Sequence, residues 1–230
     1  MDNIYVDLFA TKGLEYLLVI VFLVSLVIFW RILQRPARSR ALESSTGLAT
    51  PKVEWFALAD GLYYHQGHSW ARPEEENVVL VGIDDFAQHL LGRADRVDLP
   101  AVGARIDQGE SAWKFRYQSR SIDLVSPVSG RVLDVNREVL RSPAIINDDP
   151  YGKGWILKVH VPKLRTNLRN LLHGHLARSW MEETVRSLRR LMSPASLPAL
   201  QDGGVPISGF ARTLSPDHWE EIARGFLLTE

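Results

Sequence analysis

The sequence predicts a mainly β domain that follows an N-terminal transmembrane helix and precedes a C-terminal α-helical extension. The prediction rests on a long apolar run near the N-terminus, short apolar runs between turn residues in the middle, and helical periodicity near the end. The predicted parts are a short tail over residues 1–13, a transmembrane helix over 14–33, a linker over 34–54, the β domain over 55–162 and the helical extension over 163–230.

Composition excludes several classes of function. The 230 residues include 27 basic and 27 acidic side chains, so no net charge attracts nucleic acid. There is no cysteine, which excludes disulfides, thiol nucleophiles and Cys-ligated zinc. The sequence also contains neither a Gly-Xaa-Ser-Xaa-Gly elbow nor a phosphate-binding Gly-Lys-Ser/Thr loop. We therefore expect no nucleic-acid partner, no metal and no enzyme activity.

The apolar run near the N-terminus has the length of a membrane span. Between residues 14 and 33 only Glu15, Ser25 and Arg31 are polar, and twenty helical residues extend about 30 Å, the thickness of a hydrocarbon core. One basic residue, Lys12, precedes the run, and four arginines stand between residues 31 and 40. This asymmetry predicts a single-pass membrane protein whose bulk is cytoplasmic, at the inner membrane if the source is bacterial.

The residues after this run predict a linker and then strands. Residues 34–54 have no periodic apolar pattern and indicate a tether. From Trp55 to Val161, short apolar runs alternate with turn residues, as in a β-sandwich or barrel. Residues 84–91 are the exception, because their apolar side chains have helical spacing and Gly92 supplies a stop. A short helix should therefore interrupt the strands.

Several motifs in this domain share one order and spacing with a known family. They are His68-Ser-Trp70, Val81-Gly-Ile-Asp-Asp-Phe-Ala-Gln88, Ser126-Pro-Val-Ser-Gly130, Val135-Asn136 and Ile146-Asn-Asp-Asp-Pro-Tyr-Gly-Lys-Gly-Trp155. On these motifs, residues from about 63 to 161 resemble the glycine cleavage system H protein. The resemblance implies a flattened β-barrel of two sheets, similar to lipoyl and biotinyl domains. The family-motif residues are His68, Trp70, Gly82, Asp84, Ser126, Pro127, Gly130, Asn136, Asp149, Pro150, Gly152, Gly154 and Trp155.

The resemblance also implies a hairpin that presents one lysine, which carries lipoate in amide linkage. Aligned without a gap on Gly109-Glu-Ser111 and Asp123, this chain has Ser119 at the lysine position. Neither a serine hydroxyl nor the always-protonated guanidinium of Arg120 forms that amide. The nearest lysine, Lys114, stands five residues earlier, on the incoming strand. We therefore expect no cofactor, with lipoate on Lys114 as the alternative.

The predicted hairpin combines basic and aromatic residues, a composition that suits contact with an acidic partner. The candidate partner contacts are Lys114, Arg116, Tyr117 and Arg120. Ordinary strand alternation gives a second interpretation, in which the aromatic side chains form core and the basic ones are solvated. A protein partner is expected, but its identity does not follow from the sequence.

The last seventy residues lie largely outside the resemblance. Leucines and other apolar residues recur at three- and four-residue spacing from Leu164 to Leu188, which predicts one long amphipathic helix. Its own domain, anionic lipid and a partner helix are three possible surfaces for its apolar face. Ser215-Pro-Asp217 predicts the start of a last helix. The apolar face of that helix would consist of Trp219, Ile222, Ala223 and Phe226.

Three functional hypotheses follow. The first is a membrane-tethered, H-protein-like domain that is not lipoylated and acts as a binding or scaffolding subunit. The second is a working lipoyl carrier, the aminomethyl shuttle of glycine cleavage, that uses Lys114 or another lysine. The third is an outward-facing envelope adaptor with a lipoyl-like hairpin, as in the membrane-fusion proteins of efflux systems.

Overall fold

The computed structural model describes residues 16–26, 29, 52–192 and 206–229. The chain divides into two units, Met1–Glu43 and Ser44–Glu230. In the first unit, residues 16–26 are helical with exposed side chains. The predicted tail over residues 1–13 and most of the predicted linker over 34–54 lie outside the described residues.

The prediction of a transmembrane helix over residues 14–33 is wrong. Among the described residues, no helix combines the length and the apolar character that crossing a membrane requires. The predicted single-pass membrane localisation is contradicted by the same finding.

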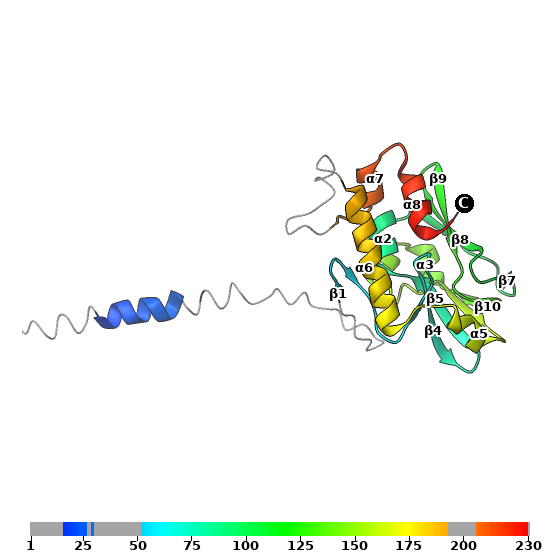
Figure 1. The fold of residues 1–230 in the computed structure, drawn as a ribbon, viewed down its shortest axis with the longest axis horizontal. Helices are drawn as coiled ribbons and strands as arrows, with labels where there is room; N and C mark the ends of the chain where they lie inside the picture. The colour runs from blue at the N-terminus through cyan, green and yellow to red at the C-terminus, as the bar shows by residue number, and fades with distance from the viewer. Residues whose placement is uncertain (1–15, 27–28, 30–51, 193–205, 230) are drawn as a thin grey trace, which may run out of the picture. The chain divides into compact units, whose positions relative to one another are not determined.

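The second unit is built on three antiparallel sheets (Figure 1). A six-stranded sheet has the order β3-β4-β5-β11-β10-β7, a three-stranded sheet has the order β6-β8-β9, and β1 pairs with β2. The strands are β1 Lys52–Val53, β2 Phe56–Ala57, β3 Tyr63–Tyr64, β4 Ser69–Glu75, β5 Val78–Ile83, β6 Arg96–Asp98, β7 Arg105–Ile106, β8 Ser111–Tyr117, β9 Arg120–Val125, β10 Gly130–Val135 and β11 Leu157–His160. The predicted mainly β domain is thus confirmed.

The burial of each strand reflects its position in a sheet. In β5 all residues after Val78 are buried, as expected of a strand between neighbours on both sides. In β8 the side chains alternate, and Trp113, Phe115 and Tyr117 are buried. These residues join a single hydrophobic core that spans the sheets.

The predicted helix near residues 84–91 is confirmed as α2, Asp85–Leu91. Asp84 is its N-cap, and an Asp84 carboxylate oxygen accepts a hydrogen bond from the Ala87 amide at 2.8 Å. Gly92 ends the helix with φ +69°, a conformation that favours glycine. Two further short helices, α3 Arg137–Arg141 and α4 Ile145–Asp148, follow β10.

The single long helix predicted after residue 163 is two helices, α5 Leu164–Arg169 and α6 Gly174–Leu191. Between them, the Leu172 and Tyr64 backbones exchange two hydrogen bonds, of 2.7 and 2.8 Å. Gly174 has φ +55°. The leucine spacing continues through this break, so helical periodicity alone did not reveal it.

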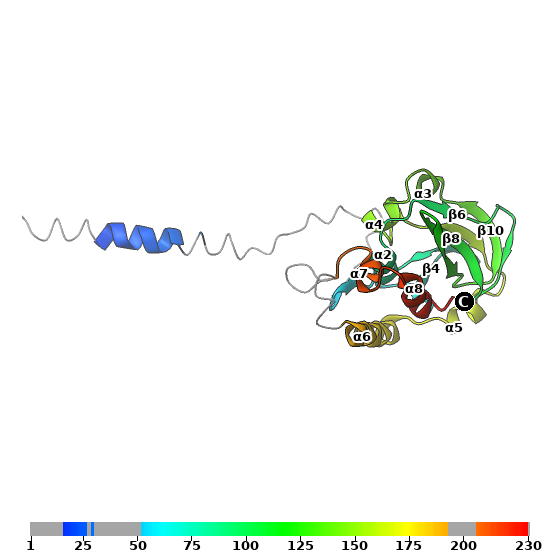
Figure 2. The same ribbon diagram turned by 90° about the horizontal axis from the view of Figure 1, so that it is seen from above.

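Helix α6 packs on its own domain, which was one of the three predicted surfaces (Figures 1 and 2). Its residues Ala177, Met181, Val185 and Leu188 are buried in the core of the β domain. Its outer face forms ion pairs with the same domain, among them Arg189 with Glu54 at 2.7 Å. The apolar face of this helix therefore has its partner within the chain.

The chain ends in α7, Phe210–Leu214, and α8, Trp219–Leu227. Residues 216–218 form a turn, so α8 begins later than Ser215-Pro-Asp217 predicted. The apolar face is confirmed, since Trp219 and Ala223 are buried and Ile222 and Phe226 pack against the core. Figures 1 and 2 both place α8 beside the hairpin of β8 and β9.

Candidate functional site

The hairpin of β8 and β9 has an exposed two-residue tip. Tyr117 pairs with Arg120, which leaves Gln118 and Ser119 as the turn. Gln118 has φ +52°, and its amide donates a hydrogen bond to the Asp95 carboxylate at 2.6 Å. Ser119 is exposed at this tip, where the resemblance places the lysine of an H protein.

The two faces of the hairpin differ in chemistry. The aromatic side chains of β8 point into the core, whereas Lys114 and Arg116 lie on the outer face. Lys114 forms an ion pair with Asp123 across the hairpin at 3.2 Å, and Arg116 forms one with Asp98. Strand alternation thus explains why basic and aromatic residues alternate along β8. Carboxylates of the same domain form ion pairs with both basic side chains.

The other two candidate contacts, Tyr117 and Arg120, lie against the C-terminal segment. The Tyr117 and Trp219 rings meet edge to face, with centroids 5.4 Å apart. The Arg120 guanidinium donates to the Asp217 carbonyl at 3.2 Å and lies 3.7 Å from a Glu220 carboxylate oxygen. The structure therefore separates the four candidates into an outward pair and a pair under α8.

Arg212 completes the junction between the hairpin and the C-terminal segment. Its guanidinium lies 4.9 Å from the Tyr117 ring centroid and 5.4 Å from that of Trp219. Burial raises the pKa of the Tyr117 phenol well above its usual range, so the side chain stays neutral. Sequence reasoning did not single out Arg212, because nothing in its local pattern reports a contact with a distant hairpin.

A pocket of about 410 Å³ opens beside Ser119 at this junction. The described residues that line it include Arg93, Arg120 and Arg212 but no lysine, and Asp95 is the one acidic residue among them. The described lining therefore contains no lysine amine for an amide bond, and guanidinium groups stay protonated. Guanidinium groups thus supply most of the charge in the described lining of this pocket.

The family-motif residues hold the domain together. His68 and Asp84 are almost fully buried, and the imidazole Nδ1 lies 2.7 Å from a carboxylate oxygen. The His68 ring stacks on Phe86 at 4.2 Å and packs against Trp180 of α6 at 4.6 Å. This pair therefore joins β4, α2 and α6.

Trp70 is the second anchor of the frame. It is fully buried, and its indole N–H donates to the carbonyls of Ile83 at 2.9 Å and Pro150 at 3.2 Å. Gly82 lies opposite it in the strand pairing, and a Cβ at Gly82 would lie 2.5 Å from the indole ring. The ring thus requires a glycine at this position.

The remaining motif residues shape turns. The Asn136 carboxamide caps α3 and donates to the carbonyls of Lys153 and Trp155. The Asp149 carboxylate accepts from the amides of Gly152 and Lys153. Further hydrogen bonds join the Ser126 hydroxyl to the Val128 carbonyl, the Gln108 carboxamide to the Pro127 carbonyl and the Gly154 amide to the Asp149 carbonyl. At Gly130, a Cβ would collide with the His160 carbonyl oxygen. None of these contacts provides catalytic chemistry.

A second ionisable pair lies at α2 and was not foreseen. Burial raises the pKa of Asp85, but the hydrogen bond and the charge of His89 outweigh this, and the net pKa is lowered. Burial lowers the pKa of His89, yet Asp85 raises it by more.

Within the described part of the chain, no group of three His, Asp or Glu side chains could hold a metal ion.

This mainly β domain, with one exposed hairpin tip beside α8, is a domain of the lipoyl type. The family model for glycine cleavage H-protein matches residues 62–184. The chain therefore belongs to the glycine cleavage H-protein family.

Two relatives agree with this assignment. The glycine cleavage system H protein of Coprothermobacter proteolyticus is 47% identical over 104 residues, which are 45% of this chain and 82% of that protein. The probable glycine cleavage system H protein of Pyrococcus horikoshii is 39% identical over 121 residues, 53% of this chain and 90% of that one. A glycine cleavage system H protein from Mycobacterium marinum, known from a crystal structure, is 33% identical in sequence. The similarity covers 46% of this chain and 87% of that chain, with a TM-score of 0.42.

Proposed function

We propose that this chain is an H-protein-like subunit that carries no lipoate and acts by binding other proteins. The observation that carries the proposal is Ser119 at the exposed hairpin tip, where the family resemblance expects the lipoyl lysine. A hydroxyl at this place supplies no amine for the amide bond. The domain would then retain the H-protein frame without its swinging arm.

The surroundings of Lys114 support the proposal. Lys114 lies within β8, where it pairs with Asp123 in register and by a 3.2 Å ion pair. The Lys114 side chain is 39% exposed and lies within a strand, whereas Ser119 is exposed in a turn. A ligase that modified it would have to work on the flat outer face of a sheet.

The C-terminal segment gives a second reason. Trp219 and Glu220 of α8 contact Tyr117 and Arg120, the two residues that flank the tip. A protein that approaches the tip therefore meets the C-terminal segment as well. We infer that the partner of this chain contacts a surface composed of the hairpin and α8 together.

The test of lipoylation is intact-mass measurement after co-expression with an active lipoate ligase and lipoate. We expect the wild-type chain to remain unmodified. Ser119→Lys restores an amine at the tip and should gain a lipoyl group, and Lys114→Arg serves as a control. A lipoyl group on wild-type Lys114, absent from Lys114→Arg, would contradict the proposal and establish the carrier alternative.

Partner binding needs a separate test. Quantitative affinity purification from the native source should compare wild type, Arg93→Glu in the wall of the tip pocket, and Arg137→Glu outside it. A partner of the tip surface should be depleted by Arg93→Glu and retained by Arg137→Glu. Equal recovery with all three chains would contradict a binding role for this surface.

A further inference from the structure

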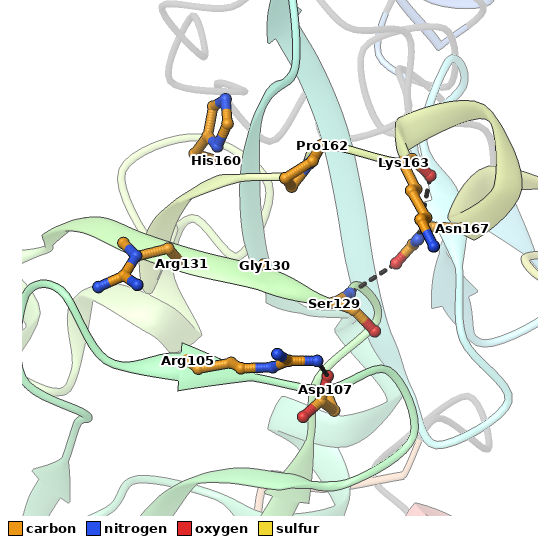
Figure 3. A pocket seen from close by; sticks show the side chains of 9 residues that line it. All are labelled: Arg105, Asp107, Ser129, Gly130, Arg131, His160, Pro162, Lys163 and Asn167. Carbon is orange, nitrogen blue, oxygen red and sulfur yellow. Dashed lines mark hydrogen bonds and ion pairs between the residues drawn. The ribbon is translucent and has the colours of Figure 1, made fainter.

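A second pocket, of about 440 Å³, lies away from the hairpin tip and concentrates positive charge. It is bounded by β7, by the start of β10, by the end of β11 and by α5 (Figure 3). Arg105 and Arg131 come from neighbouring strands, and Lys163 lies across from them with Ser129 and Gly130 between. His160 and Asp107 complete its ionisable lining.

The base of this pocket is held by partly buried hydrogen bonds. The Ser129 amide donates to the Asn167 carboxamide oxygen at 2.5 Å, and the Ser129 hydroxyl accepts from the Gln108 amide at 2.8 Å. The Gln108 side chain in turn donates to the Asn167 carbonyl at 3.0 Å. These bonds fix Ser129 and leave its hydroxyl proton free to donate into the pocket.

Gly130 brings two walls of the pocket together. A Cβ at this position would lie 2.3 Å from the His160 carbonyl oxygen. Glycine thus permits β10 and β11 to approach where Arg131 and His160 emerge. The shape of the pocket is consequently built into the backbone.

The charges of this pocket are not balanced. Asp107 lies 3.4 Å from Arg105, and it is the one acidic residue in the described lining. Within the described part of the chain, neither Arg131 nor Lys163 has a carboxylate within 4.0 Å. The Arg131 guanidinium donates instead to the Gly103 carbonyl at 2.9 Å. Two positively charged residues without a described counter-ion therefore line this concave surface, with the Arg131 guanidinium directed away from Ser129 (Figure 3).

We propose that this pocket binds a phosphate group. A phosphate carries about two negative charges, which match the two unbalanced cations, and its oxygens accept hydrogen bonds from a guanidinium, an ammonium and a hydroxyl. The pocket volume falls in the range of small-molecule sites, so a larger phosphorylated group fits as well as the free ion. The phosphate belongs either to a small metabolite or to a phosphorylated side chain. This site is independent of the proposed function of the hairpin.

The first experiment is an NMR titration of the full chain with inorganic phosphate at constant ionic strength, with chloride as the reference salt. We expect saturable shifts of the Ser129, Gly130 and Arg131 amides. Lys163→Ala and Arg131→Ala should each weaken binding about tenfold, because each removes a charge-assisted contact. Arg137→Ala, which removes the same charge on α3, should change the affinity by less than about twofold.

The same titration with O-phosphoserine and with a phosphoserine peptide separates the two sources of phosphate. Tighter binding of the peptide than of the amino acid indicates a phosphorylated protein, and equal binding indicates a small molecule. Absence of saturable shifts with all three ligands would overturn the proposal. An equal loss of affinity in Arg137→Ala and Lys163→Ala would also overturn it, because it would reduce the effect to net charge. Since Lys163 makes no ion pair with a described carboxylate, its variant should keep the wild-type spectrum elsewhere.

Discussion

Tyr117 at the end of β8 and Trp219 at the start of α8 meet edge to face, with ring centroids 5.4 Å apart and an interplanar angle of 84°. The two residues are 6% and 4% exposed. This contact joins the family hairpin to a segment outside the residues matched by the H-protein family model. The C-terminal extension is therefore part of the surface at the hairpin tip.

The first prediction concerns this contact. Trp219→Ala should destabilise the chain by about 3 kcal/mol, because it removes a buried aromatic side chain and leaves a cavity. Urea unfolding measures the change, and hydrogen exchange should show faster exchange at the end of β8. Leu228→Ala, at an exposed position, should cost about 0.5 kcal/mol or less. Equal costs for the two variants would show that α8 does not pack as described.

A pair of glycines should respond with opposite signs to the same substitution. Gly82→Ala should destabilise by about 1–3 kcal/mol, because the new methyl group would collide with the Trp70 ring. Gly225→Ala, on the exposed side of α8 with nothing within 4 Å, should stabilise by about 0.5–1 kcal/mol through helix propensity. Thermal and urea unfolding of both variants test the prediction. A neutral Gly82→Ala would mean that Trp70 is free to move.

The third prediction concerns the buried carboxylate of Asp84. Asp84→Ala should cost about 3 kcal/mol, since it removes the N-cap of α2 and leaves the His68 ring nitrogen without its partner. Asp84→Asn keeps an oxygen that can cap the helix and should cost less. Asp148→Ala, which breaks an ion pair 67% exposed on both sides, should cost about 0.5 kcal/mol or less. If Asp84→Ala costs as little as Asp148→Ala, the buried pair does not stabilise the frame.

Stability should depend on pH through Asp85 and His89. The pKa of His89 is raised on folding, so its contribution is complete below the unfolded value of 6.5 and is lost as pH rises through the folded pKa. The pKa of Asp85 is lowered, so its contribution is present above the unfolded value of 3.8 and is lost as pH falls through the folded pKa. The pair therefore contributes most between these two unfolded values.

The corresponding measurement compares wild type with His89→Gln in urea at about pH 5.5 and about pH 8.5. The difference in unfolding free energy should be larger at the lower pH. Burial and His68 lower the pKa of His65, which has the opposite pH dependence, but both chains retain His65, so its effect cancels. A constant difference between the two pH values would contradict the raised pKa of His89.

Local patterns in the sequence predicted the elements whose structure is decided locally. The cap at Asp84 and the stop at Gly92 defined α2, and strand alternation explained why Lys114 and Arg116 face outward while Tyr117 is buried. The resemblance placed Ser119 at the hairpin tip because the family motifs fix the register on both sides of it. Each of these predictions depends on neighbouring residues.

The features that the sequence did not predict depend mainly on contacts between segments that are distant in the sequence. The break at Asn170–His173 is fixed by the backbone pairing of Leu172 with Tyr64, which leucine spacing does not report. The phosphate pocket collects Arg105, Arg131 and Lys163 from three separate segments, so no motif identifies it. Hydropathy predicted a membrane span over residues 14–33, whereas no helix in the described part of the chain is long and apolar enough to cross a membrane.

The central claim is that the hairpin of this H-protein-like chain carries no lipoate. The most direct test is intact-mass measurement of the chain purified from its native source, followed by peptide mapping from Trp113 to Asp123. We predict an unmodified mass and an unmodified hairpin peptide. A lipoyl group on Lys114, or on any other lysine of the chain, would contradict the claim and make the protein a lipoyl carrier.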